Sequence, residues 1–162
     1  MMDRGDIKTA FDQLSEAAID ACSIIYLLKT GVFESLAAVL PLVTTDHVYG
    51  ETGWPISEGK PRLALTLYPE SPQARSNDHG LFLLARERNI PLISEDKEVL
   101  SLAAGVGLPY YNSLMMLIFL CHKGRITTEE YPEYLERLLS EAHYGKSVIE
   151  RGEEYFRKIL IN

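Results

Sequence analysis

The chain has 162 residues, of which 46% are hydrophobic and 24% charged, and its formal net charge is −7. These values exclude a disordered or fibrous chain, and the length predicts a single domain over residues 1–162. The acidic total argues against a protein that coats nucleic acid by neutralising its phosphates. It leaves open a site in which acids hold cations, because bound metal ions reverse the local charge.

The sequence shows no targeting segment and no membrane span. Residues 1–8 are polar, and apolar runs such as residues 114–121 are far too short to cross a bilayer. Cys22 and Cys121 lie in apolar surroundings without CxxC spacing. We therefore expect two buried, free thiols in a cytoplasmic protein.

The first part of the chain alternates short apolar runs with amphipathic stretches. Residues 1–16 are weakly patterned and predict a frayed start or a short helix, and residues 17–20 predict a buried strand that ends in Asp20. The next expected elements are a helix over 22–29 ended by Gly31, a helix over 32–40 ended by Pro41, a strand over 41–45, and a helix with Asp46 as its N-cap.

Residues 53–77 are irregular, and within them residues 62–68 fit either a helical turn or a short strand. The breakers in this stretch are Pro55, Gly59, Pro61, Pro69 and Pro72. The elements expected beyond it are a helix over 78–87 capped by Ser76 and Asn77, a strand over 90–94, a helix ending at 104, a strand over 108–112, an apolar helix over 113–123 ended by Gly124, and two C-terminal helices over 125–162. Strands that alternate with helices in this way predict an α/β fold of parallel βαβ units.

Four acids stand where predicted elements meet. Asp20 follows the first strand, Glu51 lies on the helix after the second, Asp78 opens the helix after the irregular stretch, and Asp96 follows the strand over 90–94. In a parallel sheet these positions share one edge, so the four side chains can meet in space. Singly, Asp20 could be an N-cap, Asp78 and Asp96 first-turn acids favoured by the helix dipole, and Glu51 a surface residue. Their placement at one edge favours a shared site.

Such a group of acids has a specific chemistry. Clustered carboxylates repel one another, and they either raise their pKa values or bind cations. Oxygen ligands suit hard ions such as Mg²⁺ or Mn²⁺, which activate water and stabilise in-line displacement at phosphorus. The sequence therefore favours metal-dependent phosphoryl chemistry.

Four segments, taken together, resemble the PIN domain family. This small nuclease family includes the toxin half of many toxin–antitoxin pairs, the VapC-type toxins. The matching segments are residues 19–29 around Asp20, residues 43–51 ending in Glu51, residues 77–85 around Asp78, and residues 92–96 with the helix after them, around 102–108. The resemblance covers nearly the whole chain, and its specificity comes from the order and spacing of the segments.

The resemblance implies a three-layer α/β/α sandwich on a parallel sheet of four to five strands, and Mg²⁺- or Mn²⁺-dependent cleavage of RNA. By that analogy Asp20, Glu51, Asp78 and Asp96 are catalytic and hold the metal, and Ser94 supports them. The resemblance also implies an RNA substrate, an antitoxin protein as partner and a homodimer. The alternative is a catalytically silent PIN-like module that binds RNA or protein.

The chain departs from the family pattern in three places. Cys22 stands where the family often has Ser, Thr or Asn, and Asn-Ser replaces a common Gly-Thr pair at residues 112–113. The segment between Glu51 and Asp78 is proline-rich and poorly matched. Whether Ser23 supplies the hydroxyl that is missing at position 22 stays open at this point.

Other polar residues carry weaker signals. His47 and His79 lack metal-ligand spacing, so we expect surface or capping roles, and we expect Tyr110 and Tyr111 to pack against the sheet in preference to stacking on bases. No glycine-rich phosphate loop and no Gly-x-Ser-x-Gly motif is present, which argues against ATP or NAD use and against that class of hydrolase. Basic residues that could guide phosphates, or simply form a solvated face, are Lys29, Arg62, Arg75, Lys97, Lys123 and Arg125.

Overall fold

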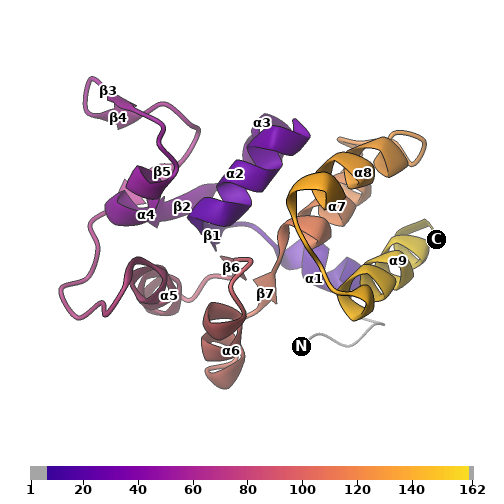
Figure 1. Cartoon of the computed structure of the whole chain (residues 1–162). Helices are drawn as coiled ribbons and strands as arrows, with labels where there is room; N and C mark the ends of the chain where they lie inside the picture. The colour runs from indigo at the N-terminus through magenta and orange to yellow at the C-terminus, as the bar shows by residue number, and fades with distance from the viewer. Residues whose placement is uncertain (1–6, 161–162) are drawn as a thin grey trace.

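A parallel five-stranded sheet forms the middle layer of the protein in the computed structural model (Figure 1). The structure describes residues 7–160. The sheet has the order β5-β2-β1-β6-β7, and every neighbouring pair is parallel. Its strands are β1 (Ala17–Ile19), β2 (Leu42–Thr45), β5 (Thr66–Tyr68), β6 (Leu92–Ile93) and β7 (Tyr110–Tyr111). The predicted parallel sheet is confirmed, and β5 shows that the undecided stretch over 62–68 ends in a strand.

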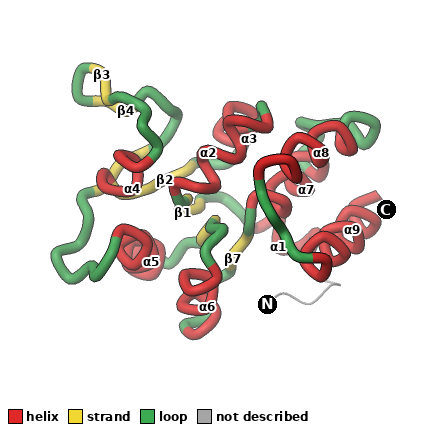
Figure 2. The backbone as a smooth tube through the Cα atoms, in the orientation of Figure 1, coloured by secondary structure: helices red, strands yellow, loops and turns green. Residues whose placement is uncertain are grey.

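Helices cover both faces of this sheet and complete the predicted α/β/α sandwich. The helix α5 packs against β1 and β2, and α6 packs against β7 and α5. The other face carries α2, α3, α7 and α8, with α1 and α9 packed against α7 (Figures 1 and 2). The helices are α1 (Ile7–Gln13), α2 (Ala21–Thr30), α3 (Phe33–Val39), α4 (Asp46–Glu51), α5 (Asn77–Arg88), α6 (Lys97–Gly105), α7 (Ser113–His122), α8 (Tyr131–Glu141) and α9 (Lys146–Leu160).

The core divides into two hydrophobic clusters because strand side chains alternate between the two faces. Ala17 and Ile19 join the cluster on the α2 and α7 face, whereas Ala18 joins the cluster on the α5 and α6 face. Both faces are therefore buried, which explains why the short strands read as nearly continuous apolar runs.

The helix boundaries follow local chemistry, with one correction to the sequence-based expectation. Gly31 ends α2 in the left-handed conformation (φ 88°), as predicted, because glycine adopts this conformation without a steric penalty. Asp46 is not the N-cap of α4. That residue is Thr45, whose hydroxyl accepts the N–H of Val48 at 3.0 Å, because β2 continues to Thr45 and the helix begins at the next residue.

Two further features complete the description. The irregular stretch contains a small antiparallel hairpin of β3 (Ile56–Ser57) and β4 (Lys60–Pro61), which the sequence analysis did not anticipate. The expected frayed or helical start is α1 from Ile7 onward, and residues 1–6 lie outside the described part. Within residues 7–160 no single helix is long and apolar enough to span a membrane; α2 and α3 pass that test only as a pair bent by 113°.

Candidate active site

The candidate site lies at the carboxyl ends of β1 and β6. From β1 the sheet runs through β2 to β5 on one side, and the chain then returns to place β6 and β7 on the other side. The strand order therefore reverses between β1 and β6, which is where parallel α/β sheets open a crevice for ligands. Asp20 directly follows β1, and Ser94 directly follows β6.

Asp20 is held by three hydrogen bonds. Its side chain is buried, with 3% of the residue exposed, and it is the N-cap of α2. Oδ1 accepts the N–H of Ser23 at 2.7 Å, and Oδ2 accepts the hydroxyl of Ser94 at 2.6 Å and the N–H of Glu95 at 3.0 Å. The cap interpretation is thus confirmed. A carboxylate offers about four lone-pair positions, so Oδ1 keeps capacity for one further partner.

Ser94 connects two of the candidate acids. Its hydroxyl is fully buried, donates to Asp20 and accepts the N–H of Asp96 at 3.0 Å. Asp96 in turn caps α6, because its Oδ1 accepts the N–H groups of Glu98 at 2.8 Å and Val99 at 3.3 Å. One chain of hydrogen bonds therefore fixes the two acids relative to each other.

Asp78 lies at the start of α5 and experiences the charge of the other three acids. Burial, followed by the charges of Asp20, Asp96 and Glu51, raises the pKa of Asp78 to about 6. A side-chain hydrogen bond with Asp96 contributes in the same direction. Asp20 and Asp96 come after β1 and β6, which are neighbours in the sheet. Glu51 and Asp78 lie on α4 and α5, which contact β2 and each other.

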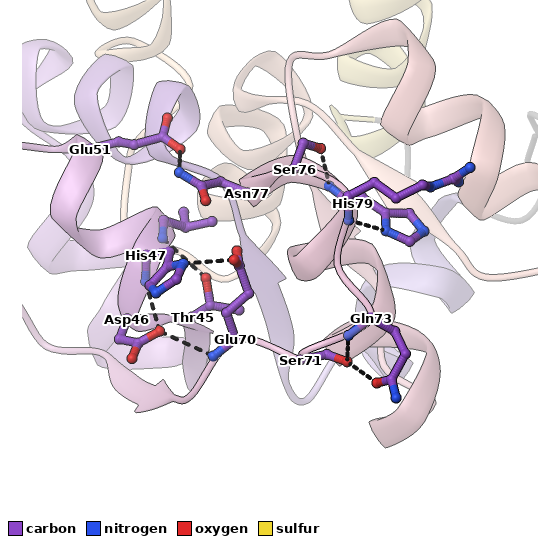
Figure 3. A network of polar contacts seen from close by, with 12 residues as sticks. Thr45, Asp46, His47, Glu51, Glu70, Ser71, Gln73, Ser76, Asn77 and His79 are labelled. Atoms are coloured by element: carbon purple, nitrogen blue, oxygen red, sulfur yellow. Dashed lines mark hydrogen bonds and ion pairs between the residues drawn. The ribbon is translucent and has the colours of Figure 1, made fainter.

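Glu51 is the most peripheral of the four. It is exposed at the end of α4, and its carboxylate accepts a hydrogen bond from the side-chain amide of Asn77 (Figure 3). Asn77 is the first residue of α5 and precedes Asp78. The bond therefore joins α4 to α5 beside the acidic edge.

The four acids differ in how freely they could bind a cation. Within residues 7–160, no group of three or more His, Cys, Asp or Glu side chains is arranged to hold a metal ion. Asp20 and Asp96 serve as helix caps, and Glu51 accepts a hydrogen bond from Asn77. All four residues carry carboxylate oxygens, which are the ligand type that hard divalent ions prefer.

The prediction that both cysteines are free is confirmed, and the prediction that both are buried is wrong. Both thiols are free, but Cys22 is exposed and Cys121 is half-buried. Cys22 is the second residue of α2 and is exposed, whereas its neighbour Ser23 is fully buried. Burial, followed by the charges of Asp20, Glu95 and other acids of this edge, raises the pKa of the Cys22 thiol.

The structure reveals a fifth acid, Glu95, that the sequence analysis did not single out. Its Oε2 accepts the hydroxyl of Ser23 at 2.5 Å and both the hydroxyl and the N–H of Ser113, at 2.9 and 3.0 Å. Its Oε1 accepts the hydroxyl of Tyr144, in the loop between α8 and α9. Burial raises the pKa of Glu95, and the hydrogen bonds from Ser23 and Tyr144 oppose the rise. Ser23 thus supplies its hydroxyl to Glu95 and its N–H to Asp20.

A second polar cluster lies beside Glu51 and fastens the irregular segment to α4 (Figure 3). The Nδ1 atom of His47 lies 2.6 Å from Oε2 of Glu70, and Oδ1 of Asp46 accepts the N–H groups of His47 and Glu70. Oε1 of Glu70 is buried and has no hydrogen-bond partner among residues 7–160. It lies against Gly80, where an added Cβ would be 2.6 Å from this oxygen.

A cavity of about 590 Å³ opens beside the acids, between the starts of α5 and α6. Asp78 and Asp96 line it together with Arg75, His79 and Lys97. His79 accepts the backbone N–H of Arg75 on its Nδ1 at 3.1 Å. The cavity therefore places two exposed cationic residues next to two of the candidate acids.

A second cavity, of about 400 Å³, lies away from the acids, where mainly apolar residues of α6, β7, α7 and α9 line it. The two tyrosines of β7 pack as expected, with Tyr111 buried and Tyr110 half-buried.

Compared with known protein families, with curated proteins and with solved structures, the chain gives no match.

Proposed function

We propose that the protein is a metal-dependent endoribonuclease in which Asp20, Glu51, Asp78 and Asp96 hold Mg²⁺ or Mn²⁺. The observation that carries the proposal is the geometry at the reversal of the strand order, where Ser94 binds both the carboxylate of Asp20 and the N–H of Asp96. Burial and the charges of the other three acids also raise the pKa of Asp78 to about 6, which agrees with this arrangement. Like charges gathered at a half-buried edge are unfavourable on their own, and a divalent cation relieves that repulsion. The resemblance of the four segments to the PIN family supports the same assignment.

Each residue of the site has a distinct part in this proposal. When bound, the divalent ion supplies a water nucleophile and stabilises the charge of an in-line displacement at phosphorus. Asp20 presents a carboxylate that three hydrogen bonds hold in place, and Ser94 keeps it in register with Asp96. Water attacks phosphorus and the bond to the 3′ oxygen breaks, so the products carry 5′-phosphate and 3′-hydroxyl ends.

The neighbouring cavity supports a phosphate-bearing substrate. Arg75 and Lys97 are exposed on its wall, and neither side chain makes a hydrogen bond or ion pair with the rest of residues 7–160. Cationic side chains of this kind position the phosphates of a nucleic acid without reading its sequence. In an acidic protein, two such residues beside the acids favour a strand that passes directly over the metal site.

The proposal is tested by incubating single-stranded RNA with the protein in Mn²⁺ and in EDTA. We expect internal cleavage only with Mn²⁺, and fragments that a 5′-phosphate-dependent exonuclease degrades. RNA that is bound but left intact in Mn²⁺ contradicts the nuclease and supports the silent binding module.

The antitoxin partner and the homodimer are further proposals that rest on the family resemblance alone. A small gene that adjoins or overlaps this one, and whose product copurifies with the protein, supports the toxin role. The mass of the purified chain in solution distinguishes a dimer from a monomer.

A further inference from the structure

The hairpin of β3 and β4 stands out from the body of the protein, beyond α4 and β5 (Figure 1). Its turn consists of Glu58 and Gly59, which both have positive φ (53° and 75°) and lie between the paired residues Ser57 and Lys60. Positive φ at both turn residues is typical of the type I′ turn, whose twist matches that of the flanking strands. The hairpin is therefore a tight and defined element, although neither of its strands joins the central sheet.

A buried tyrosine holds the base of this hairpin to the body. Tyr49 of α4 is 1% exposed, and its hydroxyl donates to the carbonyl of Pro55 at 3.2 Å and accepts the N–H of Arg62 at 2.9 Å. Pro55 directly precedes β3, and Arg62 directly follows β4. One side chain thus fastens both legs of a hairpin whose strands are too short to be stable alone.

The hairpin and the residue before it expose two large apolar side chains to solvent. Trp54 is 43% exposed and Ile56 is 54% exposed. Within residues 7–160 neither side chain belongs to one of the two hydrophobic clusters. Single exposed apolar residues are common on protein surfaces, whereas large ones gathered on one projecting element indicate a contact surface.

The charges of the hairpin favour single-stranded RNA as the occupant of this surface. Lys60 and Arg62 are exposed, and neither side chain makes a hydrogen bond or ion pair with the part of the chain that the structure describes. Over residues 54–62 they face a single acid, Glu58, in a chain whose net charge is −7. An exposed aromatic ring beside cationic side chains binds a base by stacking and the adjoining phosphates by charge. The bases must be unpaired, because a duplex buries their faces.

The hairpin also continues the surface on which the candidate acids lie. Glu51 ends α4 three residues before Trp54, and its carboxylate accepts a hydrogen bond from Asn77 at the start of α5. The cavity that Arg75 and Lys97 line opens between the starts of α5 and α6. The acids therefore have the cationic hairpin next to α4 and the cationic cavity wall next to α5 and α6.

We propose that the β3–β4 hairpin binds single-stranded RNA, with one base stacked on Trp54 and the phosphates beside Lys60 and Arg62. The inference rests on the proposed function, since it takes RNA as the substrate, but the binding itself requires no metal ion. Stacking tolerates any sequence because every base has a π-face. The hairpin thus adds affinity for the strand without selecting its sequence.

The fluorescence of Trp54 reports directly on this contact, because Trp54 is the only tryptophan in the chain. The native chain is titrated in EDTA with a short single-stranded RNA, and separately with an abasic strand of equal length that carries the phosphates without the bases. We expect the RNA to quench the fluorescence to saturation and the abasic strand to leave it nearly unchanged.

Variants at position 54 separate stacking from simple apolar contact. Trp54→Ala should raise the dissociation constant for fluorescein-labelled RNA, measured by anisotropy, by about fivefold or more, which corresponds to the loss of one stacked base. Trp54→Phe keeps a π-face and should retain most of the affinity, whereas Trp54→Leu keeps only apolar area and should bind like Trp54→Ala. Leu160→Ala, at an exposed apolar position of α9, is the control and should bind RNA like the native chain. Circular dichroism verifies that each variant is folded.

The other outcomes contradict the inference in different ways. If RNA binds without changing the fluorescence, and binds Trp54→Ala as tightly as the native chain, the strand does not reach the hairpin. If Trp54→Leu binds like the native chain, the contact is apolar and not stacking. If Trp54→Ala converts a dimer into a monomer and leaves RNA binding unchanged, the hairpin contacts a second copy of the chain.

The same measurements distinguish failure of the hairpin from failure of the proposed function. Cleavage of RNA in Mn²⁺ together with unchanged affinity of Trp54→Ala overturns only the role of the hairpin. Quenching in EDTA without cleavage in Mn²⁺ overturns the nuclease and supports the hairpin as an RNA-binding element. A native chain that does not bind RNA overturns both.

Discussion

The hydroxyl of Ser94 donates a 2.6 Å hydrogen bond to the carboxylate of Asp20, although the two residues stand 74 positions apart in the chain. The bond crosses from β6 to β1, at the place where the strand order of the sheet reverses. Because the same hydroxyl accepts the N–H of Asp96, it links two acids that we propose as metal ligands. The two acids are thus connected through an uncharged side chain.

Replacing Ser94 by alanine should damage both stability and metal binding. The change removes a hydrogen bond to a charged group and leaves the Asp96 N–H without its partner, so we expect a loss of about 1–3 kcal/mol in the free energy of unfolding. The dissociation constant for Mn²⁺ should rise by about tenfold. Ser101→Ala, at an exposed position of α6, is the matched control, and equal effects of the two changes would refute the role of Ser94.

Asp78 predicts a specific dependence of stability on pH in the metal-free protein. Its pKa is about 6 in the folded chain against an ordinary value of 3.8, so between these values the folded state binds more protons than the unfolded state. Stability contributed by the protonated form is therefore lost as the pH rises towards about 6. Asp78→Asn should make the chain more stable at about pH 7.5 and no more stable at about pH 4.

Urea unfolding in EDTA at these two pH values measures the effect. Glu129→Gln removes one negative charge at an exposed position far from the acids in sequence and controls for net charge. An Asp78→Asn variant that is equally stabilised at both pH values would show that the folded structure does not raise the pKa of Asp78.

Gly80 should accept a side chain only if Glu70 moves, although Gly80 lies inside α5. Alanine normally stabilises a helix interior by about 0.5–1 kcal/mol relative to glycine. At position 80, however, the new Cβ would lie 2.6 Å from Oε1 and 2.8 Å from Cγ of Glu70. We expect Gly80→Ala to lower the melting temperature and to displace Glu70 from His47.

A double-mutant comparison identifies the cause. The loss at position 80 should largely disappear when Glu70 is also replaced by alanine, because the clash is then removed. Gly50→Ala in α4, where nothing lies within 4 Å of the added Cβ, should not destabilise the protein. A Gly80→Ala variant as stable as Gly50→Ala would contradict the close approach of Glu70.

Arg75 and Lys97 should contribute to RNA affinity before any cleavage occurs. Replacing both by glutamate should weaken binding of single-stranded RNA in EDTA, and the slope of log K against log salt should fall by about 0.7 for each phosphate that the protein no longer neutralises. Arg125→Glu is the control, because Arg125 lies beyond the C-terminal end of α7, whereas the first residue of that helix, Ser113, binds Glu95 beside the acids. Equal losses of affinity in the two variants would mean that RNA does not follow the cavity beside Asp78.

The sequence predicted those parts of the structure that depend on local patterns. Apolar runs located the strands, Gly31 and Gly124 marked helix ends, and Asp20 was placed directly after a strand and at the cap of a helix. The N-cap of α4 was assigned one residue too late, because Thr45 and Asp46 are both good capping residues and only the end of β2 decides between them.

Features that depend on distant contacts could not be predicted. In the sequence, Glu95 looks like any acid that comes just before a helix. Its hydrogen-bond partners Ser23, Tyr144 and Ser113 are 72, 49 and 18 positions away along the chain. The exposure of Cys22 was missed because an apolar sequence context does not reveal which side of α2 is exposed to solvent. The edge strand β5 depends on its pairing with β2, which nothing within residues 62–68 specifies.

The most direct test of the central claim is the rate of Mn²⁺-dependent RNA cleavage by the native chain and by Asp20→Asn. Asparagine keeps the oxygen that caps α2 but loses the acceptor for the Glu95 N–H, so circular dichroism and urea unfolding establish that the variant is folded. Asp46→Asn, at an exposed acid outside the proposed metal set, is the control. We predict cleavage by the native chain and by Asp46→Asn, and a rate reduced by more than about 100-fold in Asp20→Asn, since loss of a metal ligand should exceed the cost of losing its partners. Equal rates for native and Asp20→Asn chains, or no cleavage by the native chain, would contradict the account.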